Sequence, residues 1–155
     1  MPKKIIVLGG SASGPKAAAR ARRMDYEAEI TIIQKAHDLS MASCGFPYYV
    51  GGFFDDRSKL LCTPTGVVRD PVYYMKSKKI AARTDTEAIR IDRKNKTVDV
   101  RCLLTGKEET LSYDKLIIAT GAVPRMPPVP GTDLKGITTL QSMPDADFLR
   151  KVRDE

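Results

Sequence analysis

A short apolar stretch that runs directly into a glycine-rich turn is the feature that most constrains this chain. Residues 4–8 are mostly β-branched and apolar, and Gly9-Gly10-Ser11-Ala12-Ser13-Gly14 follows at once. Residues 15–24 are expected to form a helix, since Pro15 suits a first helical turn and the alanines that follow keep its surface small. Residues 29–33 indicate a second apolar strand. Strand, turn, helix and strand within about 30 residues predict a right-handed βαβ unit.

The remaining sequence predicts further elements around this unit. Pro47 is expected to begin a short helix, and residues 53–71 are expected to be irregular. Antiparallel strands are predicted at 86–92, 97–103 and 109–112, a buried strand at 116–119, and helices at 72–79 and 144–155. The fold class is therefore α/β, a Rossmann-like nucleotide-binding domain with a small antiparallel β-meander.

Composition excludes several classes of function. The 155 residues are 42% hydrophobic, enough for an ordinary core, and contain no apolar run near the roughly 18 residues of a membrane span. The beginning of the chain lacks the apolar region of a signal peptide, so we expect neither a signal peptide nor a membrane role. The net charge of +7 is spread along the chain without interleaved aromatics, which argues against nucleic-acid binding.

Three cysteines, Cys44, Cys62 and Cys102, form an odd set without a CxxC pair. This pattern disfavours a disulfide-stapled module and a zinc or other metal site. A reducing, cytoplasmic environment fits it best.

The glycine turn has the geometry needed to bring backbone N–H groups to a pyrophosphate at the amino end of a helix. Gly9 and Gly14 occupy the first and sixth positions of the GxGxxG pattern, whereas Ser11 occupies the third. Gln34 ends the second strand, where a carboxylate usually holds a ribose hydroxyl; its amide can form the hydrogen bond without charge assistance. An ordinary βα turn, with Gln34 as a plain loop residue, is the alternative.

The segment Ser40-x-x-x-Cys44-Gly45-x-Pro47-Tyr48-x-x-Gly51 is the most specific pattern. Cys44 precedes the short predicted helix, whose amino end would stabilise a thiolate. Cys62 and Cys102 lack such surroundings and are expected to be structural. Near the end of the last predicted strand, the small residues Ala119-Thr120-Gly121 would let the chain pass close to a ligand, before a stiff proline-rich stretch.

Taken in order, these motifs resemble the FAD-dependent pyridine nucleotide–disulfide oxidoreductases that use a single active-site cysteine. The Cys44-Gly45-x-Pro47-Tyr48 pattern is most similar to coenzyme A-disulfide and coenzyme A-persulfide reductases. NADH oxidases and peroxidases are close relatives. The resemblance implies a three-layer ββα FAD-binding domain.

The resemblance also implies an FAD site and a route for electrons. The residues implied in cofactor binding are Gly9, Gly10, Ser11, Ala12, Gly14, Pro15, Gln34, Lys35, Ser43, Ala88, Ala119, Thr120 and Gly121. Electrons would pass from NAD(P)H through FAD to Cys44. In the reductases Cys44 would form a mixed disulfide with coenzyme A, whereas in the oxidases it would cycle as a sulfenic acid.

A coenzyme A site is implied at Lys16, Arg20, Arg23, Ser40 and Ser43. The spacing of the three basic residues places them on one helix face, where they would meet the phosphates of a coenzyme A-type thiol or persulfide. A solvated helix face is the alternative. Lys78 is a further candidate for a phosphate contact.

The resemblance divides the chain at residue 123. Residues 1–123 would be the first segment of the FAD-binding domain, with the antiparallel insert at about 86–112. Residues 124–155 would lead towards a nicotinamide-binding domain, and the family ends with a domain that forms a homodimer. We therefore expect a fragment that binds FAD weakly or not at all and does not turn over NAD(P)H alone. A stand-alone nucleotide-binding half-domain is the non-enzymatic alternative.

Overall fold

The computed structural model describes residues 1–155, which form two compact units. The first unit comprises residues 1–41 and 61–120, and the second comprises residues 42–60 and 121–155. Each unit is therefore built from two separate stretches of chain.

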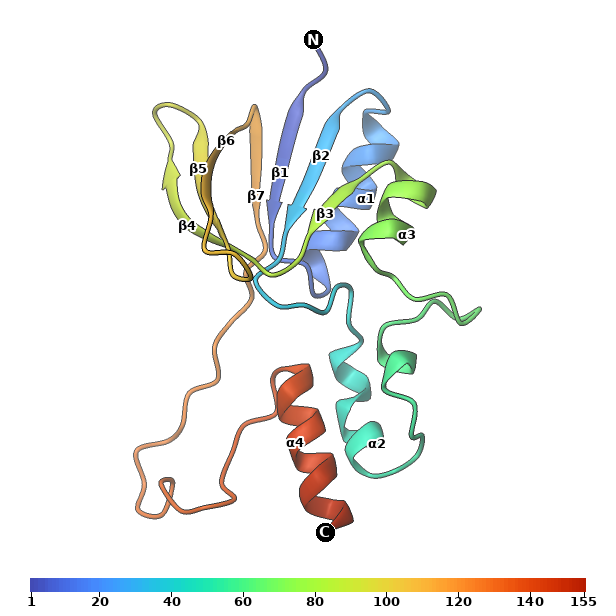
Figure 1. The fold of residues 1–155 in the computed structure, drawn as a ribbon, viewed down its shortest axis with the longest axis vertical. Helices are drawn as coiled ribbons and strands as arrows, with labels where there is room; N and C mark the ends of the chain where they lie inside the picture. Colours follow the sequence, from blue (N-terminus) through green and yellow to red (C-terminus); the bar gives the residue numbers. More distant parts are fainter. The chain divides into compact units, whose positions relative to one another are not determined.

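A parallel sheet forms the centre of the first unit (Figure 1). Its strand order is β3-β2-β1-β7, with β1 at Lys4–Leu8, β2 at Glu29–Ile33, β3 at Ala81–Arg83 and β7 at Lys115–Ile118. β1 pairs with both β2 and β7, so that Leu8 lies opposite Ile33 on one side and Ile118 on the other. The expected βαβ unit is present, with α1 at Ser13–Met24 between β1 and β2.

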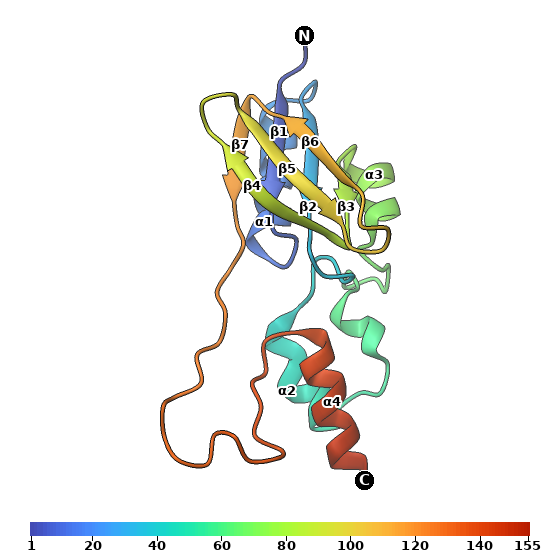
Figure 2. The ribbon, with the colours of Figure 1, turned by 60° about the vertical axis from the view of Figure 1, so that its left-hand side comes forward.

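Two different layers cover the parallel sheet. Helices α1 and α3 (Pro71–Lys78) lie on one face, and an antiparallel sheet lies on the other (Figure 2). This second sheet has the order β4-β5-β6, formed by Thr86–Asp92, Thr97–Cys102 and Glu108–Ser112. The predicted ββα arrangement with its antiparallel meander is therefore confirmed.

Strand β1 shows why this layering follows from the sequence. Val7 packs into the cluster with Ala18 and Tyr74 of the helices, whereas Ile6 and Leu8 pack with residues of the antiparallel sheet. Successive side chains of a strand point to opposite faces, so an uninterrupted apolar strand supplies both cores.

Two strand predictions needed correction. β3 was not foreseen because Ala81-Ala82-Arg83 is short and lacks β-branched residues; it is recruited by pairing with β2. β7 was expected to be buried, but it is half-exposed and Ile118 is 65% accessible, because β7 is an edge strand of this sheet.

The second unit contains two helices and two short 3-10 turns. A 3-10 turn at Ser43–Gly45 leads directly into α2 (Phe46–Val50), and a second one occupies Arg57–Leu60. Helix α4 (Met143–Asp154) packs against α2 and buries Met143 and Ala146. The expected helix at the end of the chain is thereby confirmed.

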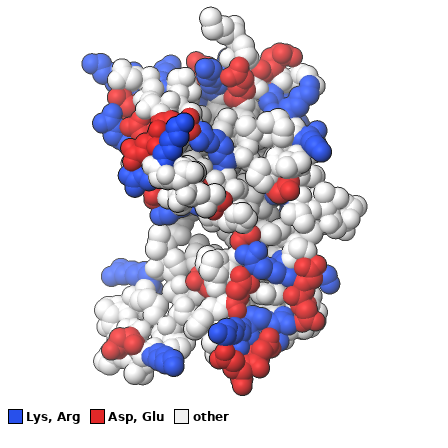
Figure 3. Space-filling view, in the orientation of Figure 1, with Lys and Arg blue, Asp and Glu red and all other residues white.

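The helices and the charged side chains limit which partners the fold suggests. No helix is long and apolar enough to span a bilayer. On the face shown in Figure 3, Lys and Arg side chains are interspersed with Asp and Glu.

Candidate nucleotide and thiol site

The glycine turn joins β1 to α1 so tightly that two of its glycines have no room for a side chain. Gly9 has a φ of +105°, and a Cβ there would lie 2.1 Å from the Ala119 carbonyl oxygen. A Cβ on Gly14 would lie 1.8 Å from the Gly9 carbonyl oxygen. Both glycines are thus required by the packing of the chain on itself, whatever ligand the turn holds.

The amino end of α1 is open to a ligand. Ala12 is its N-cap residue, so no side chain caps the helix, and no acidic residue lies in its first turn. Pro15 is buried in this turn, whereas Ala12 and Ser13 are exposed. Unpaired N–H groups and the positive end of the helix dipole are therefore available to an anion, as a pyrophosphate requires.

Gln34 is engaged beneath the turn. It is 6% exposed; its Oε1 accepts a hydrogen bond from the Gly10 N–H at 2.7 Å, and its Nε2 donates to the Asp38 carbonyl oxygen at 3.1 Å. Its backbone oxygen accepts from the Thr86 N–H. The amide predicted to meet a ribose therefore braces the glycine turn in this structure.

A cavity of about 190 Å³ adjoins the turn. Five residues implied in FAD binding line it: Gly9, Gln34, Lys35, Ala88 and Thr120. Its volume is smaller than the roughly 300–1,000 Å³ of a typical ligand pocket, so it suits one part of a dinucleotide.

Two further polar residues of this cavity were missed by the sequence reasoning. Thr86 and Glu87 begin β4, and the Glu87 carboxylate pairs with Lys35 Nζ at 2.8 Å. The hydrogen bond and the charge of Lys35 hold the pKa of Glu87 below its usual value. The position of Ala88 at the start of the same predicted strand was the available signal.

Cys44 presents a free thiol at the surface of the second unit. It lies in the 3-10 turn before α2, and both Cys44 and Ser43 are exposed. Pro47 lies in the first turn of α2, as predicted. Cys44 is thus placed on the element that the sequence indicated and is accessible to a reagent or substrate.

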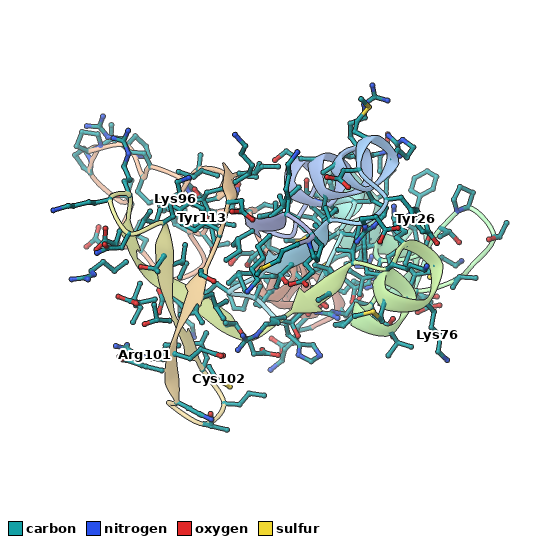
Figure 4. All side chains as sticks on the ribbon, turned by 90° about the horizontal axis from the view of Figure 1, so that it is seen from above. Tyr26, Lys76, Lys96, Arg101, Cys102 and Tyr113 are labelled. Atoms are coloured by element: carbon teal, nitrogen blue, oxygen red, sulfur yellow. The ribbon has the colours of Figure 1, made fainter.

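The other two cysteines are also free and are partly buried. Cys102 ends β5 beside Arg101 at one end of the antiparallel sheet (Figure 4). Hydrogen bonds from Thr105 lower the pKa of Cys102 despite an opposing effect of desolvation. At the other end of β5, the Tyr113 N–H donates to the Lys96 carbonyl at 2.9 Å (Figure 4). Cys102 therefore belongs to a turn of the meander, and its structural role stays a prediction.

The residues implied in binding coenzyme A differ in accessibility. Lys16, Arg20 and Arg23 are exposed on α1. Ser40, by contrast, is buried, adopts a φ of +57° and bonds to the Tyr74 hydroxyl. The three basic residues thus present a surface to a phosphate, whereas Ser40 is engaged inside the first unit. Lys78 lies over the Tyr73 ring, 5.7 Å from its centroid.

The predicted site residues divide between the two units. The glycine turn, Gln34, Lys35, Ala88, Ala119, Thr120 and the basic face of α1 lie in the first, whereas Ser43, Cys44 and Gly121 lie in the second. The roles of all these residues stay predictions, because position alone assigns no ligand.

Comparison with known proteins gives concordant results. A family model described as pyridine nucleotide-disulphide oxidoreductase matches residues 3–155. The chain is 36% identical, over 99% of its length, to a coenzyme A disulfide reductase of Staphylococcus haemolyticus, and it covers 33% of that protein. It is 32% identical to an NAD(P)H coenzyme A polysulfide/persulfide reductase of Pyrococcus horikoshii, over 100% of this chain and 32% of the relative.

Solved structures agree. An NAD-dependent persulfide reductase from A. fulgidus superposes with a TM-score of 0.88 at 42% identity, over 97% of this chain and 27% of that one. A reduced CoADR-RHD from Bacillus anthracis superposes with a TM-score of 0.89 at 34% identity, over 100% of this chain and 27% of that one. The chain thus spans about a third of the length of the curated relatives it matches.

Proposed function

Because this chain belongs to the pyridine nucleotide-disulphide oxidoreductase family, we propose that it is the flavin-binding and thiol-bearing part of an NAD(P)H-dependent reductase of coenzyme A disulfides or persulfides. The observation that carries this proposal is the free, exposed Cys44 in its Cys-Gly-x-Pro-Tyr turn. The proposal includes a division near residue 123, a homodimeric full-length protein and a reducing, cytoplasmic location.

The first unit supplies the features that FAD requires. The uncapped amino end of α1 fits the pyrophosphate, and the cavity lined by Gly9, Lys35, Ala88 and Thr120 fits part of the adenosine half. Ala119 and Gly121 would lie along the dinucleotide. When bound, FAD would supply the electron pair that reduces the mixed disulfide between Cys44 and coenzyme A.

Cys44 performs the exchange with substrate. Its thiolate attacks one sulfur of a coenzyme A disulfide, the sulfur–sulfur bond breaks, and one coenzyme A leaves as a thiolate. A mixed disulfide between Cys44 and the other coenzyme A remains. Lys16, Arg20 and Arg23 would bind the phosphates of coenzyme A, because basic side chains without ion-pair partners favour that charge.

A sulfenic acid at Cys44 is the second candidate chemistry. It is favoured by relatives named NADH oxidase. One of them, from Enterococcus faecalis, is 31% identical over 97% of this chain, and this chain covers 32% of that protein. In that chemistry the thiolate would attack a peroxide oxygen and release water or alcohol, so that Cys44 would hold an oxygen instead of a sulfur.

One experiment separates the two chemistries on the chain itself. The protein is treated in parallel with coenzyme A disulfide and with hydrogen peroxide plus a sulfenic acid trap, and the adducts at Cys44 are quantified by mass spectrometry. The proposal predicts faster formation of the coenzyme A adduct. Preferential trapping of a sulfenic acid would favour the oxidase chemistry.

Flavin binding is tested separately by equilibrium dialysis of the chain against FAD, with ADP as competitor. Binding that ADP displaces supports a site at the first unit's turn and cavity. FAD binding that ADP does not displace would contradict the placement of the adenosine half in this cavity, while leaving the thiol chemistry to its own test.

A further inference from the structure

Arg150 of α4 binds the end of the segment that begins with Cys44. Its Nη1 donates to the carbonyl oxygens of Tyr49, at 2.8 Å, and Phe54, at 2.9 Å. The Tyr49 carbonyl lies at the carboxyl end of α2, where it also accepts from the Gly52 N–H at 3.1 Å, and the Phe54 carbonyl lies beyond the helix. The Arg150 side chain is only 14% exposed. It therefore satisfies two backbone acceptors from a largely covered position.

Arg153, one helical turn further along α4, binds the neighbouring backbone. Its Nη1 donates to the Val50 carbonyl oxygen at 2.8 Å. Gly52, with a φ of +82°, allows this approach, because a Cβ on Gly52 would lie 2.2 Å from the same Nη1. Two guanidinium groups thus bind three backbone carbonyls at and beyond the carboxyl end of α2, and a planar fork of donors suits that task.

Side chains reinforce the same contact. The Arg150 guanidinium lies over the Tyr49 ring, 5.2 Å from its centroid. The Tyr49 hydroxyl donates to Asp147 at 3.2 Å, and Arg57 binds the other oxygen of Asp147 at 3.0 Å. Burial first, and then Asp147, raise the pKa of Tyr49.

The held segment is continuous with Cys44. The Gly45 N–H donates to Ala42, the Gly51 N–H to Pro47 and the Phe53 N–H to Tyr48, all at 2.8 or 2.9 Å. Successive short hydrogen-bonded turns therefore connect the 3-10 turn that carries Cys44 to the carbonyls that Arg150 binds.

We propose that Arg150 is a positioning residue for Cys44: by binding the Tyr49 and Phe54 carbonyls it anchors the turn–helix segment on α4 and fixes where the thiol is presented. The inference rests on the proposed function only in taking Cys44 as the reactive thiol. The anchoring itself is independent of flavin and substrate.

The test is amide hydrogen exchange on the complete 155-residue chain, comparing native protein with Arg150→Ala. Exchange at the amides of Gly51, Gly52 and Phe53 is expected to accelerate about tenfold. Their hydrogen bonds open more often once Arg150 no longer holds the Tyr49 and Phe54 carbonyls. Amides of β1 and β2 in the first unit are expected to keep their native rates. Rates at Gly51 to Phe53 within about twofold of native would overturn the inference.

Two control variants identify which interaction matters. Asp55→Ala removes the exposed carboxylate that also pairs with Arg150, and Lys151→Ala removes an exposed cation on the adjacent position of α4. Neither change touches the carbonyl bonds, so both are expected to leave exchange within about twofold. Acceleration by either variant equal to that of Arg150→Ala would contradict the assignment.

Positioning is separated from simple stability by the reactivity of the thiol. Trypsin cleavage yields one peptide with Cys44, residues 36–57, and separate peptides for Cys62 and Cys102. Arg150→Ala is expected to increase the alkylation rate of Cys44 about threefold while the other two rates stay unchanged. Arg150→Lys, which keeps the charge but loses the fork, is expected to restore less than half of the native exchange protection.

If Arg150→Ala prevents folding, Arg153→Ala provides the second variant. It removes one contact with this backbone, at Val50, and the pair with the adjacent Asp154. It is expected to accelerate amide exchange at Gly52 and Phe53 about threefold. Equal acceleration in both units, or at all three cysteines, would show a global loss of stability and would overturn the positioning role.

Discussion

The Gln34 side chain accepts a hydrogen bond from the Gly10 N–H at 2.7 Å, and this bond supports the glycine turn from below. The same amide donates to the Asp38 carbonyl oxygen, so one side chain ties the turn after β1 to the loop after β2. A glutamine can make both bonds, since it carries an acceptor and a donor, whereas a carboxylate cannot donate at neutral pH.

Replacing Gln34 by Ala is expected to destabilise the protein by about 1–3 kcal/mol, because the buried Gly10 N–H loses its acceptor. Urea denaturation measures this change. Gln141→Ala is the matched control: its amide is exposed and reaches only the Ala122 carbonyl at 3.3 Å, so the change should stay within about 0.5 kcal/mol. Equal effects of both variants would contradict the bracing role of Gln34.

Gly9→Ala is expected to cost about 3 kcal/mol or more, because both the positive φ and the contact with Ala119 oppose a Cβ. Gly106→Ala isolates the backbone term: its φ is +72° and no atom lies within 4 Å of a Cβ there, so the cost should be about 1–2 kcal/mol. Thermal unfolding compares the two. A cost at Gly9 no larger than at Gly106 would show that the turn can move away from Ala119.

Much of the first unit followed from the sequence. The run from Lys4 to Leu8 and the turn after it predicted the βαβ unit, because strand and helix periodicities are local properties. β3 was not predictable in this way, because Ala81-Ala82-Arg83 forms a strand only through its parallel pairing with β2. Non-local pairing has no local signal.

The same limit applies to the candidate site. The position of Cys44 just before a short helix was predicted from the order of Cys44, Gly45 and Pro47, whereas its exposure was learned from the structure. The burial of Ser40 against Tyr74 depends on a helix more than thirty residues away in the chain. The Lys35–Glu87 ion pair forms only because β4 packs beside the end of β2. Both are set by tertiary packing, which no local pattern records.

The α4 cap is expected to weaken at low pH. Desolvation raises the pKa of Asp145, but hydrogen bonds from the backbone of Gln141 and Ser142 outweigh it, and the net shift is downward. A carboxyl with a lowered pKa in the folded state stabilises the protein fully above its ordinary value of 3.8, and this contribution is lost as the pH falls through the lowered value.

Unfolding measured against pH tests this cap. Asp145→Asn should be less stable than the native chain at neutral pH, and the difference should shrink as the pH falls below 3.8. Asp133→Asn, at an exposed position, should show no such difference at either pH. A stability difference at Asp145 that does not change with pH would contradict the role of its charge.

The basic face of α1 is expected to select for a phosphate-bearing disulfide. Arg20→Ala should slow the reaction of Cys44 with coenzyme A disulfide about three- to tenfold and leave the reaction with glutathione disulfide within about twofold. Arg93→Ala removes an exposed cation elsewhere and serves as the control for net charge. Stopped-flow rates at low and high salt measure the effect, and equal slowing by both variants would reduce it to general electrostatics.

The site and the selectivity of the reaction with coenzyme A disulfide test whether Cys44 is the substrate-reactive thiol. The native chain is incubated with coenzyme A disulfide and digested with trypsin, and the mass of each cysteine peptide is measured by mass spectrometry. We expect one coenzyme A adduct on residues 36–57, formed about tenfold faster than the glutathione adduct and absent in Cys44→Ser. Adducts that form equally on Cys62 and Cys102, or no preference for coenzyme A at Cys44, would contradict it.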